Sequence, residues 1–370
     1  MKKLLFICLC VLSLSCQQDK RMKSIKTIVF ETNNDIYREG FSDTEHSFLF
    51  YTTNGNNMLY KYYLNSDKRD TIDLAEKMKI KRLSRYNIFF NKEDYIVNYG
   101  HANVYNSAEN VVYKLDSLSN YNGMEYTIAL NNASSWKNNK LLLTNLFTCD
   151  LYGKGGDLTE TFIACEQLNK QKPSYSILDF ENSEVESSTI TFKDIKPKTK
   201  DNSAEIWFKA TAIYVKDVIL YNNHFIDAVY EVDEAGSFKK AFTVKSKYTN
   251  FEEIEIFKSE DVSTVYDNAI NYATQVNGIL YDEYHNKILV VLVHGTKDIE
   301  NNGEKKFTNR PFSILVYDTD YNFEKEYLFD HSKYDYHGVF VCKEGLIINA
   351  NNKLGDAYEP QKLIYEIFSY

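Results

Sequence analysis

ILVYDTDYNFEKEYLF, residues 314–329, contains an apolar strand with aromatic residues, a polar turn and a second, more charged segment. Aromatic and β-branched residues favour strands, and Asp and Asn favour the turn between them. Recurrence of such a unit along a chain indicates an architecture built from repeated β units. The same order of segments recurs at five other places: MLYKYYLNSDKRDTIDL (58–74), VVYKLDSLSNY (111–121), YSILDFENSEV (175–185), AVYEVDEAGSFKKAF (228–242) and KLIYEIFSY (362–370).

The starts of the six copies lie 53, 64, 53, 86 and 48 residues apart. Over residues 26–370 this spacing averages about 57 residues per copy, close to the size of a four-stranded propeller blade with its loops. We therefore predict an all-β fold, a single six-bladed β-propeller of four-stranded blades that spans residues 26–370. A pair of β-sandwich domains would explain the strands but not their recurrence.

One strand-like segment, KTIVFE at residues 26–31, stands apart from the six copies. In propellers the first strand often completes the last blade, because this removes an unpaired sheet edge. We predict that the N-terminal strand, residues 25–31, pairs with residues 362–368 and closes the last blade.

Local patterns give a hairpin and two short helices. The runs HSFLFYTT (46–53) and MLYKYYL (58–64) flank Asn54-Gly55, and Asn-Gly between strand-like runs predicts a hairpin. Residues 70–82 and 259–273 have the apolar spacing of short helices.

The N-terminus, MKKLLFICLCVLSLSC, combines a basic start with an apolar run of eleven residues and ends at Cys16. A membrane-spanning helix needs about twenty apolar residues, so this run has the length of a signal-peptide core instead. The segment resembles a bacterial lipoprotein signal with two altered lipobox positions; the alternative is an ordinary secretory signal with an incidental cysteine. We predict a signal peptide over residues 1–15, lipidation of Cys16 and a tether over residues 16–25, so that the membrane is contacted only through the acyl anchor.

The composition excludes several classes of protein. With 44% hydrophobic and 26% charged residues the chain is not disordered, and a mean hydropathy of -0.45 excludes a polytopic membrane protein. The formal net charge of -9 argues against a nucleic-acid partner, because an acidic surface repels phosphates. Beyond the leader, Cys149, Cys165 and Cys342 lack metal-ligand spacing; we expect buried thiols, with a Cys149–Cys165 disulfide as the open alternative.

The chain resembles a known family in three features. These are two C-terminal phrases, the predicted lipidated cysteine and the spacing of the six repeated units. The phrases are GILYDEYHNKILVVLVHG (278–295) and VCKEGLIINANNKLGDAYEPQKLIYEIFSY (341–370). They resemble uncharacterised Bacteroidota lipoproteins, in particular domain-of-unknown-function family 4221, whose members look like six-bladed, TolB-like propellers. The resemblance implies a fold and an envelope location, and it implies no activity.

No motif carries a recognisable catalytic site. HExxH and GxSxG spacings are absent, so we predict no catalytic residues, no metal ligands and no cofactor. Asp318, Asp320 and Asn322 match the first half of a calcium loop. Phe323 and Phe329 occupy its glycine and glutamate positions, which favours a turn between strands.

Two clusters are candidates for a ligand site. His331 and His337 flank Asp335, where a structural turn is favoured over a metal or acid–base site. The other cluster lies in residues 281–285, because aromatic side chains on an inter-strand loop suit a sugar or peptide ligand. We predict a ligand-binding role there, with inter-blade packing of the tyrosines as the alternative, for Tyr281, Asp282, Tyr284 and His285.

The chain is expected to be a lipoprotein of the cell envelope, attached to the outer membrane and facing the periplasm or the surface. Its first predicted function is to bind an envelope protein, peptide or glycan, because rigid blades present loops and no catalytic constellation is visible. The alternative is a propeller hydrolase or lyase that acts on polysaccharide or peptide, and a third interpretation is a structural subunit of an outer-membrane assembly. Converging carboxylates or histidines would favour the enzyme, and an exposed aromatic patch on the rim would favour a partner surface.

Overall fold

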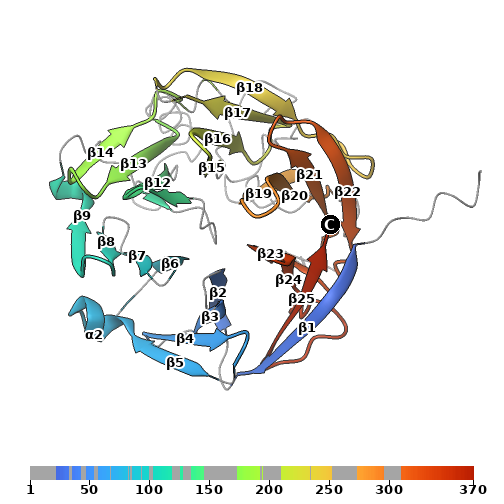
Figure 1. Ribbon diagram of the computed structural model, residues 1–370, viewed down its shortest axis with the longest axis horizontal. Coiled ribbons are helices and arrows are strands. Elements are labelled where there is room, and N and C mark those ends of the chain that lie inside the picture. Colours follow the sequence, from blue (N-terminus) through green and yellow to red (C-terminus); the bar gives the residue numbers. More distant parts are fainter. Residues whose placement is uncertain are drawn as a thin grey trace, which may run out of the picture.

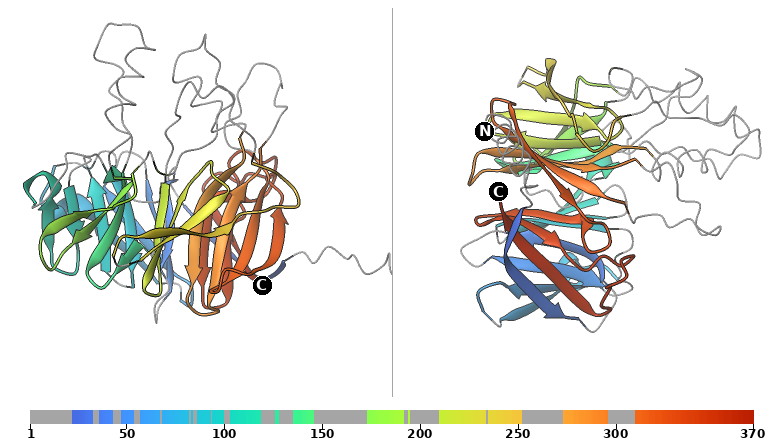
Figure 2. Two further views of the ribbon diagram at one scale, coloured as in Figure 1. Left: turned by 90° about the horizontal axis from the view of Figure 1, so that it is seen from above. Right: turned by 90° about the vertical axis from the view of Figure 1, so that its right-hand side faces the viewer.

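The computed structural model is a ring of six antiparallel β-sheets around a central axis (Figure 1). Seen from the side, the inner strands run roughly along that axis (Figure 2). Among the described residues, no helix has the length and apolar character needed to cross a membrane. The structure describes residues 22–32, 36–42, 47–53, 57–66, 68–81, 83, 86–92, 94–99, 103–118, 126–127, 135–145, 173–191, 194, 210–233, 235–251, 273–295 and 310–370.

Each blade has four strands arranged in order from the axis outward, and blade 3 has a short fifth strand beside them, which confirms the predicted propeller. Blade 1 contains β2 (Ile36–Ser42), β3 (Phe48–Thr53), β4 (Met58–Tyr63) and β5 (Arg69–Asp73), and blade 2 contains β6 (Tyr86–Asn91), β7 (Asp94–Tyr99), β8 (Asn103–Asn106) and β9 (Val111–Lys114). Blade 3 contains β10 (Tyr126–Thr127), β12 (Lys140–Asn145), β13 (Tyr175–Asp179) and β14 (Glu184–Ser187), with β11 (Trp136–Lys137) also paired to β12. Blade 4 contains β15 (Ala210–Val215), β16 (Val218–Asn223), β17 (Ala228–Val232) and β18 (Phe238–Thr243). Blade 5 contains β19 (Gln275–Asp282), β20 (Lys287–Val293), β21 (Phe312–Asp318) and β22 (Phe323–Phe329). Blade 6 contains β23 (Asp335–Cys342), β24 (Gly345–Asn349), β25 (Lys362–Ser369) and β1 (Lys23–Glu31).

The N-terminal strand closes the last blade, as predicted. β1 pairs antiparallel with β25 from Lys23 opposite Ser369 to Glu31 opposite Lys362. β1 begins at Lys23, two residues before the predicted strand start, so Lys23 and Ser24 of the predicted tether belong to the sheet. The strand gains these two residues because β25 continues to Ser369, so that Lys23 pairs with Ser369 and Ser24 with Phe368.

The repeated phrase proves to be the outer hairpin of a blade. It covers β4–β5, β13–β14, β17–β18 and β21–β22 in blades 1, 3, 4 and 5, and in blade 6 it supplies β25. The copy at residues 111–121 is out of phase, because it begins at β9, the fourth strand of blade 2 rather than the third. Part of the uneven spacing therefore comes from this one shift.

Short polar turns join the strands, and aspartates stabilise several of them. The Asp318 carboxylate accepts hydrogen bonds from the N–H groups of Asp320 and Asn322, both at 2.9 Å, which confirms a turn at that place. Asp179 accepts in the same way from the N–H of Asn182 at 3.1 Å. The predicted hairpin of blade 1 is also confirmed by the pairing of β3 with β4, whereas Asn54-Gly55 lies outside the described residues.

The helix predicted over residues 70–82 is much shorter in the structure. α2 spans Leu74–Met78, and the Asp73 side chain caps it by accepting from the N–H groups of Ala75 and Glu76. The first residues of the predicted segment pair with β4 as β5, because β4 would otherwise have an open edge. The second predicted helix, residues 259–273, lies outside the described residues except for Ala273.

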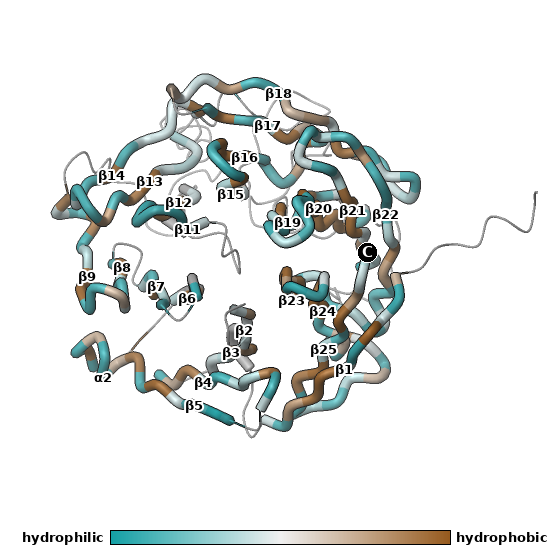
Figure 3. The backbone as a smooth tube through the Cα atoms, in the orientation of Figure 1, coloured by the Kyte–Doolittle hydropathy of each residue, from teal (hydrophilic) through white to brown (hydrophobic). Residues whose placement is uncertain are grey.

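Apolar side chains fill the contacts between neighbouring blades. One cluster joins blades 4 and 5 and includes Val229, Ile279 and Val290, all fully buried. Another joins blades 6 and 1 at the point of closure and includes Leu49, Ile347 and Tyr365. Figure 3 shows that hydrophobic residues are concentrated along strands such as β20 and β21, whereas the outer strand β22 is largely hydrophilic.

Candidate functional site

Polar side chains from three neighbouring blades meet on the inner strands of the ring. β23 is the innermost strand of blade 6, and it contacts β19 of blade 5 on one side and β2 of blade 1 on the other. These three strands present partly exposed polar side chains, and we call this set the inner polar site: Glu39, Asn277, Asp335 and His337.

An irregularity in β23 shapes this site. Asp335 pairs with Asn349 of β24, but the next paired residue is Val339, so residues 336–338 form a bulge. Bulges re-aim side chains and are common near functional sites. At Gly338 a side chain would not fit, because a Cβ atom there would lie 2.6 Å from Oε1 of Glu39. The bulge therefore brings the backbone of blade 6 against a carboxyl group of blade 1.

Glu39 is held by two hydrogen bonds across the closing junction. Tyr365 Oη donates to Oε2 at 2.6 Å, and Asn349 Nδ2 donates to Oε1 at 2.8 Å. Burial raises the pKa of Glu39, and the hydrogen bonds from Tyr365 and Asn349 oppose this effect without cancelling it. The nearby negative charge of Asp335 raises the pKa further. The pKa of Glu39 thus lies above that of an exposed glutamate.

Asp335 and His337 form a carboxylate–imidazole pair. Nδ1 of His337 lies 2.9 Å from Oδ1 of Asp335, and the side chains are 46% and 25% exposed, respectively. Burial alone would raise the pKa of Asp335, but the hydrogen bonds and charge of His337 outweigh it, so the pKa is lowered. Because an ionised carboxylate only accepts, Nδ1 of His337 donates this hydrogen bond.

The two carboxyl groups of the site therefore have pKa values that are shifted in opposite directions. Such a difference is typical of sites where one group donates a proton and another accepts one. Asn277 adds an amide, whose Nδ2 donates to the backbone oxygen of Tyr336 at 3.4 Å. The site can offer hydrogen-bond donors and acceptors to a polar ligand at once.

Of the predicted histidine cluster, the structure brings together Asp335 and His337, while His331 lies beside Asp330 at 3.8 Å. The favoured structural turn is present at residues 331–333, where the N–H of Ser332 donates to the Asp330 carboxylate at 2.9 Å, and Asp335 and His337 follow it in β23. Sequence reasoning missed Glu39 entirely, because its partners Asn349 and Tyr365 are 310 and 326 residues away. A single sequence contains no signal for such a contact.

The predicted ligand residues at 281–285 form the turn between β19 and β20. Asp282 is fully buried, and its Oδ1 accepts from the N–H groups of Tyr284 and His285 at 2.9 and 3.0 Å. Its Oδ2 lies 2.8 Å from Nδ1 of His285 and accepts a hydrogen bond from the hydroxyl of Tyr370, the last residue of the chain. Asp282 thus ties blade 5 to blade 6.

The tyrosines of this turn have different surroundings. Tyr281 packs against the cluster between blades 4 and 5, while the ring of Tyr284 is exposed. This fits the packing alternative for Tyr281. A ligand role for the turn stays a prediction.

One acidic group among the described residues has donor atoms close enough together to hold a metal ion: Asp179, Glu184 and Glu186. Lys140 forms ion pairs with two of the three, with Nζ 3.2 Å from Asp179 and 3.1 Å from Glu186. This geometry forms an ion-pair network. Cys342 is a buried thiol, as expected, whereas Cys16, Cys149 and Cys165 lie outside the described residues.

Comparisons with known proteins agree with the fold. Neither the family models nor the curated proteins contain a match to the sequence. A crystal structure of a member of the DUF4221 family from Bacteroides vulgatus is similar over 94% of this chain and 98% of its own, with a TM-score of 0.73 and 15% identity. The resemblance stated from the sequence is therefore confirmed at the level of the fold.

More distant similarities are to virginiamycin B lyase from Staphylococcus aureus and to regucalcin, a calcium-binding protein from Agrobacterium tumefaciens. The first covers 93% of this chain and 99% of the lyase, with 10% identity and a TM-score of 0.43. The second covers 94% of both chains, with 10% identity and a TM-score of 0.44.

Proposed function

We propose that the chain is a binding module of the cell envelope that holds a neutral, hydroxyl-rich ligand, such as a short glycan, at the inner polar site. The observation that carries this proposal is that partly exposed hydrogen-bond donors and acceptors from three blades meet at this site. His337 and Asp335 are both partly exposed, and Glu39 lies next to them in blade 1. Specific ligand sites use a few such polar groups on a rigid frame.

The charge of the protein supports a neutral ligand over an anionic one. The formal net charge is -9, and Asp335 is held in its ionised form. A polyanion would be repelled by both. Hydroxyl groups both donate and accept hydrogen bonds, so they match the mixture of carboxyl, amide and imidazole groups.

The enzyme is the second candidate, because the same residues could transfer protons. His337, held by Asp335, has the arrangement of a general base, and Glu39 has the raised pKa of a general acid. This supports a hydrolase or lyase acting on polysaccharide or peptide.

The proposed location follows from the N-terminal signal. Removal of residues 1–15 and lipidation of Cys16 would leave seven residues, 16–22, before β1. A segment of that length reaches at most about 25 Å, so the propeller would stay close to the outer membrane. Cys16→Ala should release the protein from the membrane fraction, and continued membrane attachment with no acyl mass would contradict the anchor.

The function is tested by calorimetric titration of the Cys16→Ala protein with neutral oligosaccharides. Binding should weaken by about tenfold or more in Asp335→Asn and in His337→Ala, because each removes a charge-assisted hydrogen bond. Asp217→Asn is the matched control, since its side chain is 89% exposed and lies in the turn between β15 and β16 of blade 4, outside the inner polar site. Unchanged affinity in both site variants would refute the proposal, and product formation that needs His337 would favour the enzyme.

A further inference from the structure

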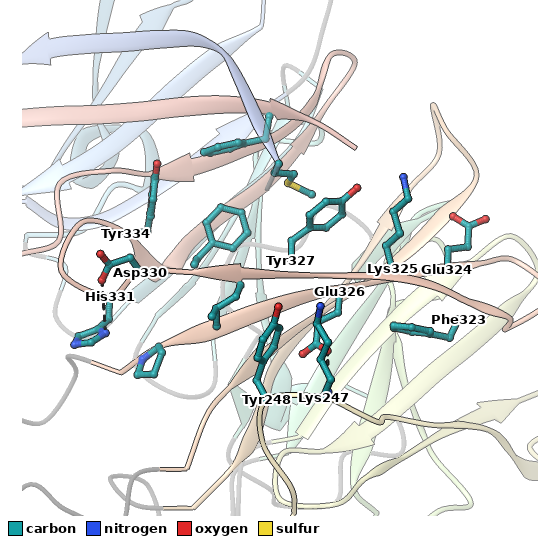
Figure 4. Close-up of a pocket in the computed structure, with 15 residues that line it drawn as sticks. Lys247, Tyr248, Phe323, Glu324, Lys325, Glu326, Tyr327, Asp330, His331 and Tyr334 are labelled. Carbon is teal, nitrogen blue, oxygen red and sulfur yellow. Dashed lines mark hydrogen bonds and ion pairs between the residues drawn. The ribbon is translucent and has the colours of Figure 1, made fainter. Parts of the chain in front are cut away.

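A groove follows the outer edge of blade 5, and none of the four residues of the inner polar site lines it. It has a volume of about 770 Å³ and is lined by all seven residues of β22, Phe323–Phe329 (Figure 4). Lys247 and Tyr248, which follow β18, line it on one side, and Tyr334 and Phe368 of blade 6 line it on the other. We call it the β22 groove.

β22 presents to this groove a sheet edge with which no strand of the described residues pairs. It pairs with β21 and is the last strand of its sheet. Alternate N–H and C=O groups of such a strand point away from the sheet and can pair with another chain. Because consecutive residues of β22 line the groove, the groove follows the backbone edge and both faces of the strand.

The length of β22 distinguishes it from most of the other outer strands. It has seven residues, whereas β5, β9 and β14 have five, four and four. Seven residues extend over about 23 Å, enough for a continuous ladder of hydrogen bonds.

The two faces of β22 differ in their side chains. The register with β21 puts Lys325, Tyr327 and Phe329 on the side of blade 6, where Tyr327 and Phe329 pack into the cluster of that junction. Phe323 and Leu328 lie on the side of blade 4, and they are 52% and 48% exposed. In Figure 4, Lys325 and Tyr327 lie on one side of the strand and Phe323 and Glu326 on the other.

The charges along the strand are unevenly compensated. Glu324 forms an ion pair with Lys287, and Glu326 accepts from the hydroxyl of Ser246 and from the N–H of Lys247 at 2.9 Å. Lys325 has no ion-pair partner within the described part of the chain. On the side of blade 6 the strand therefore presents the positive charge of Lys325, whereas the carboxylate of Glu326 lies on the side of blade 4.

We propose that the β22 groove binds an extended peptide segment of a partner protein as a fifth, antiparallel strand of blade 5. Backbone hydrogen bonds to the unpaired edge of β22 hold the peptide and fix its alignment along the strand, as in other cases of strand addition. An acidic residue of the peptide lies opposite Lys325. Apolar residues two and four positions before it lie opposite Tyr327 and Phe329, since antiparallel strands run in opposite directions and alternate residues share a face.

The test uses a blocked, fluorescein-labelled heptapeptide with the sequence Thr-Leu-Thr-Leu-Thr-Asp-Thr and the Cys16→Ala protein. Fluorescence anisotropy should show saturable binding, and Lys325→Glu should weaken it by about tenfold or more. A peptide with Lys in place of Asp should regain binding to Lys325→Glu. Lys240→Glu is the matched control, because Lys240 lies on β18, the outer strand of blade 4.

A second peptide, N-methylated at alternate amides, separates strand addition from side-chain docking. It should lose binding, because methylation removes the donors that pair with the edge of β22. Equal affinity of the methylated peptide, or of Lys325→Glu for the original peptide, would overturn the proposal. A β22-dependent dimer in analytical ultracentrifugation, with no peptide binding, would also overturn it and would assign the groove to a second copy of this chain. The inner polar site plays no part in any of these outcomes.

Discussion

The closing junction between blades 6 and 1 buries an acid, whereas blade 5 buries a base. Burial raises the pKa of Glu39 at the junction and lowers the pKa of His294 in blade 5 to about 4. In both cases the protein environment favours the neutral form. The comparison shows that the ring contains two groups whose contributions to stability depend on pH with opposite signs.

The two regions also differ in how the chain builds them. The hydrogen bonds of Glu39 join residues more than 300 positions apart, because they connect the second strand of the chain to the last blade. Blade 5 is one continuous segment, in which Nε2 of His294 lies 2.8 Å from Oγ of Ser313. The backbone oxygen of His294 accepts from Nε of the buried Arg310 at 2.9 Å. The closing junction therefore depends on contacts between residues far apart in the sequence, whereas blade 5 depends on contacts between residues close in the sequence.

The largest effect is expected from removing β1, residues 23–31. The deletion leaves β25 with an open edge and exposes the closing cluster, in which Ile28 is buried. Burial of one large aliphatic or aromatic side chain contributes about 1.5–3 kcal/mol, so the loss of Ile28 and the partly buried Phe30 alone should cost about 4 kcal/mol. Urea denaturation monitored by circular dichroism should show this loss in the free energy of unfolding.

A pair of adjacent substitutions sharpens this experiment. Ile28→Ser should destabilise the protein strongly, whereas Val29→Ser should have little effect, because Val29 lies on the exposed face of β1. Equal effects of the two substitutions, or an unchanged unfolding midpoint after the deletion, would mean that β1 does not close the ring.

The sequence predicts the architecture better than the site, and the difference has a physical cause. Outer hairpins such as residues 314–329 are local, so their apolar and polar alternation can be recognised without knowledge of the rest of the fold. The closing strand is predictable because an open edge is unfavourable. The Glu39 contacts and the tie from Tyr370 to Asp282 depend on how distant blades meet, which no local pattern contains. The bulge after Asp335, which shapes the inner polar site, is likewise set by packing against Glu39 and Asn349.

An effect of intermediate size is expected when the pH is lowered, because blade 5 contains the buried His294. His294 has an ordinary pKa of 6.5 when unfolded and about 4 when folded, because burial disfavours its charged form. Arg310 lowers the pKa further, and Glu326 opposes this. Between pH 6.5 and 4 the unfolded chain binds a proton that the folded protein does not, so stability falls as the pH falls. The loss should reach about 3 kcal/mol at pH 4, where carboxylate titrations add their own effects.

His294→Gln should remove this part of the pH dependence, because glutamine does not titrate. Free energies of unfolding would be compared at pH 7 and pH 5 for the wild type, for His294→Gln and for His331→Gln. His331 is the matched control, since its side chain is 40% exposed. If the free energy of unfolding falls as much between pH 7 and pH 5 in His294→Gln as in the wild type, His294 is not the cause of the fall.

The smallest effect is expected at Glu39, and it has the opposite sign. Because the folded pKa of Glu39 lies above its ordinary value of 4.5, its contribution is fully present below pH 4.5 and is lost as the pH rises through the folded pKa. Glu39→Gln should therefore gain stability relative to the wild type as the pH rises from 4.5 to 7. Glu39→Ala should cost about 1–3 kcal/mol at pH 4.5, because it leaves Tyr365 and Asn349 without their buried acceptor. If the difference between Glu39→Gln and the wild type is the same at both pH values, Glu39 is ionised in the folded protein, and its role as the proton-donating member of the inner polar site is excluded.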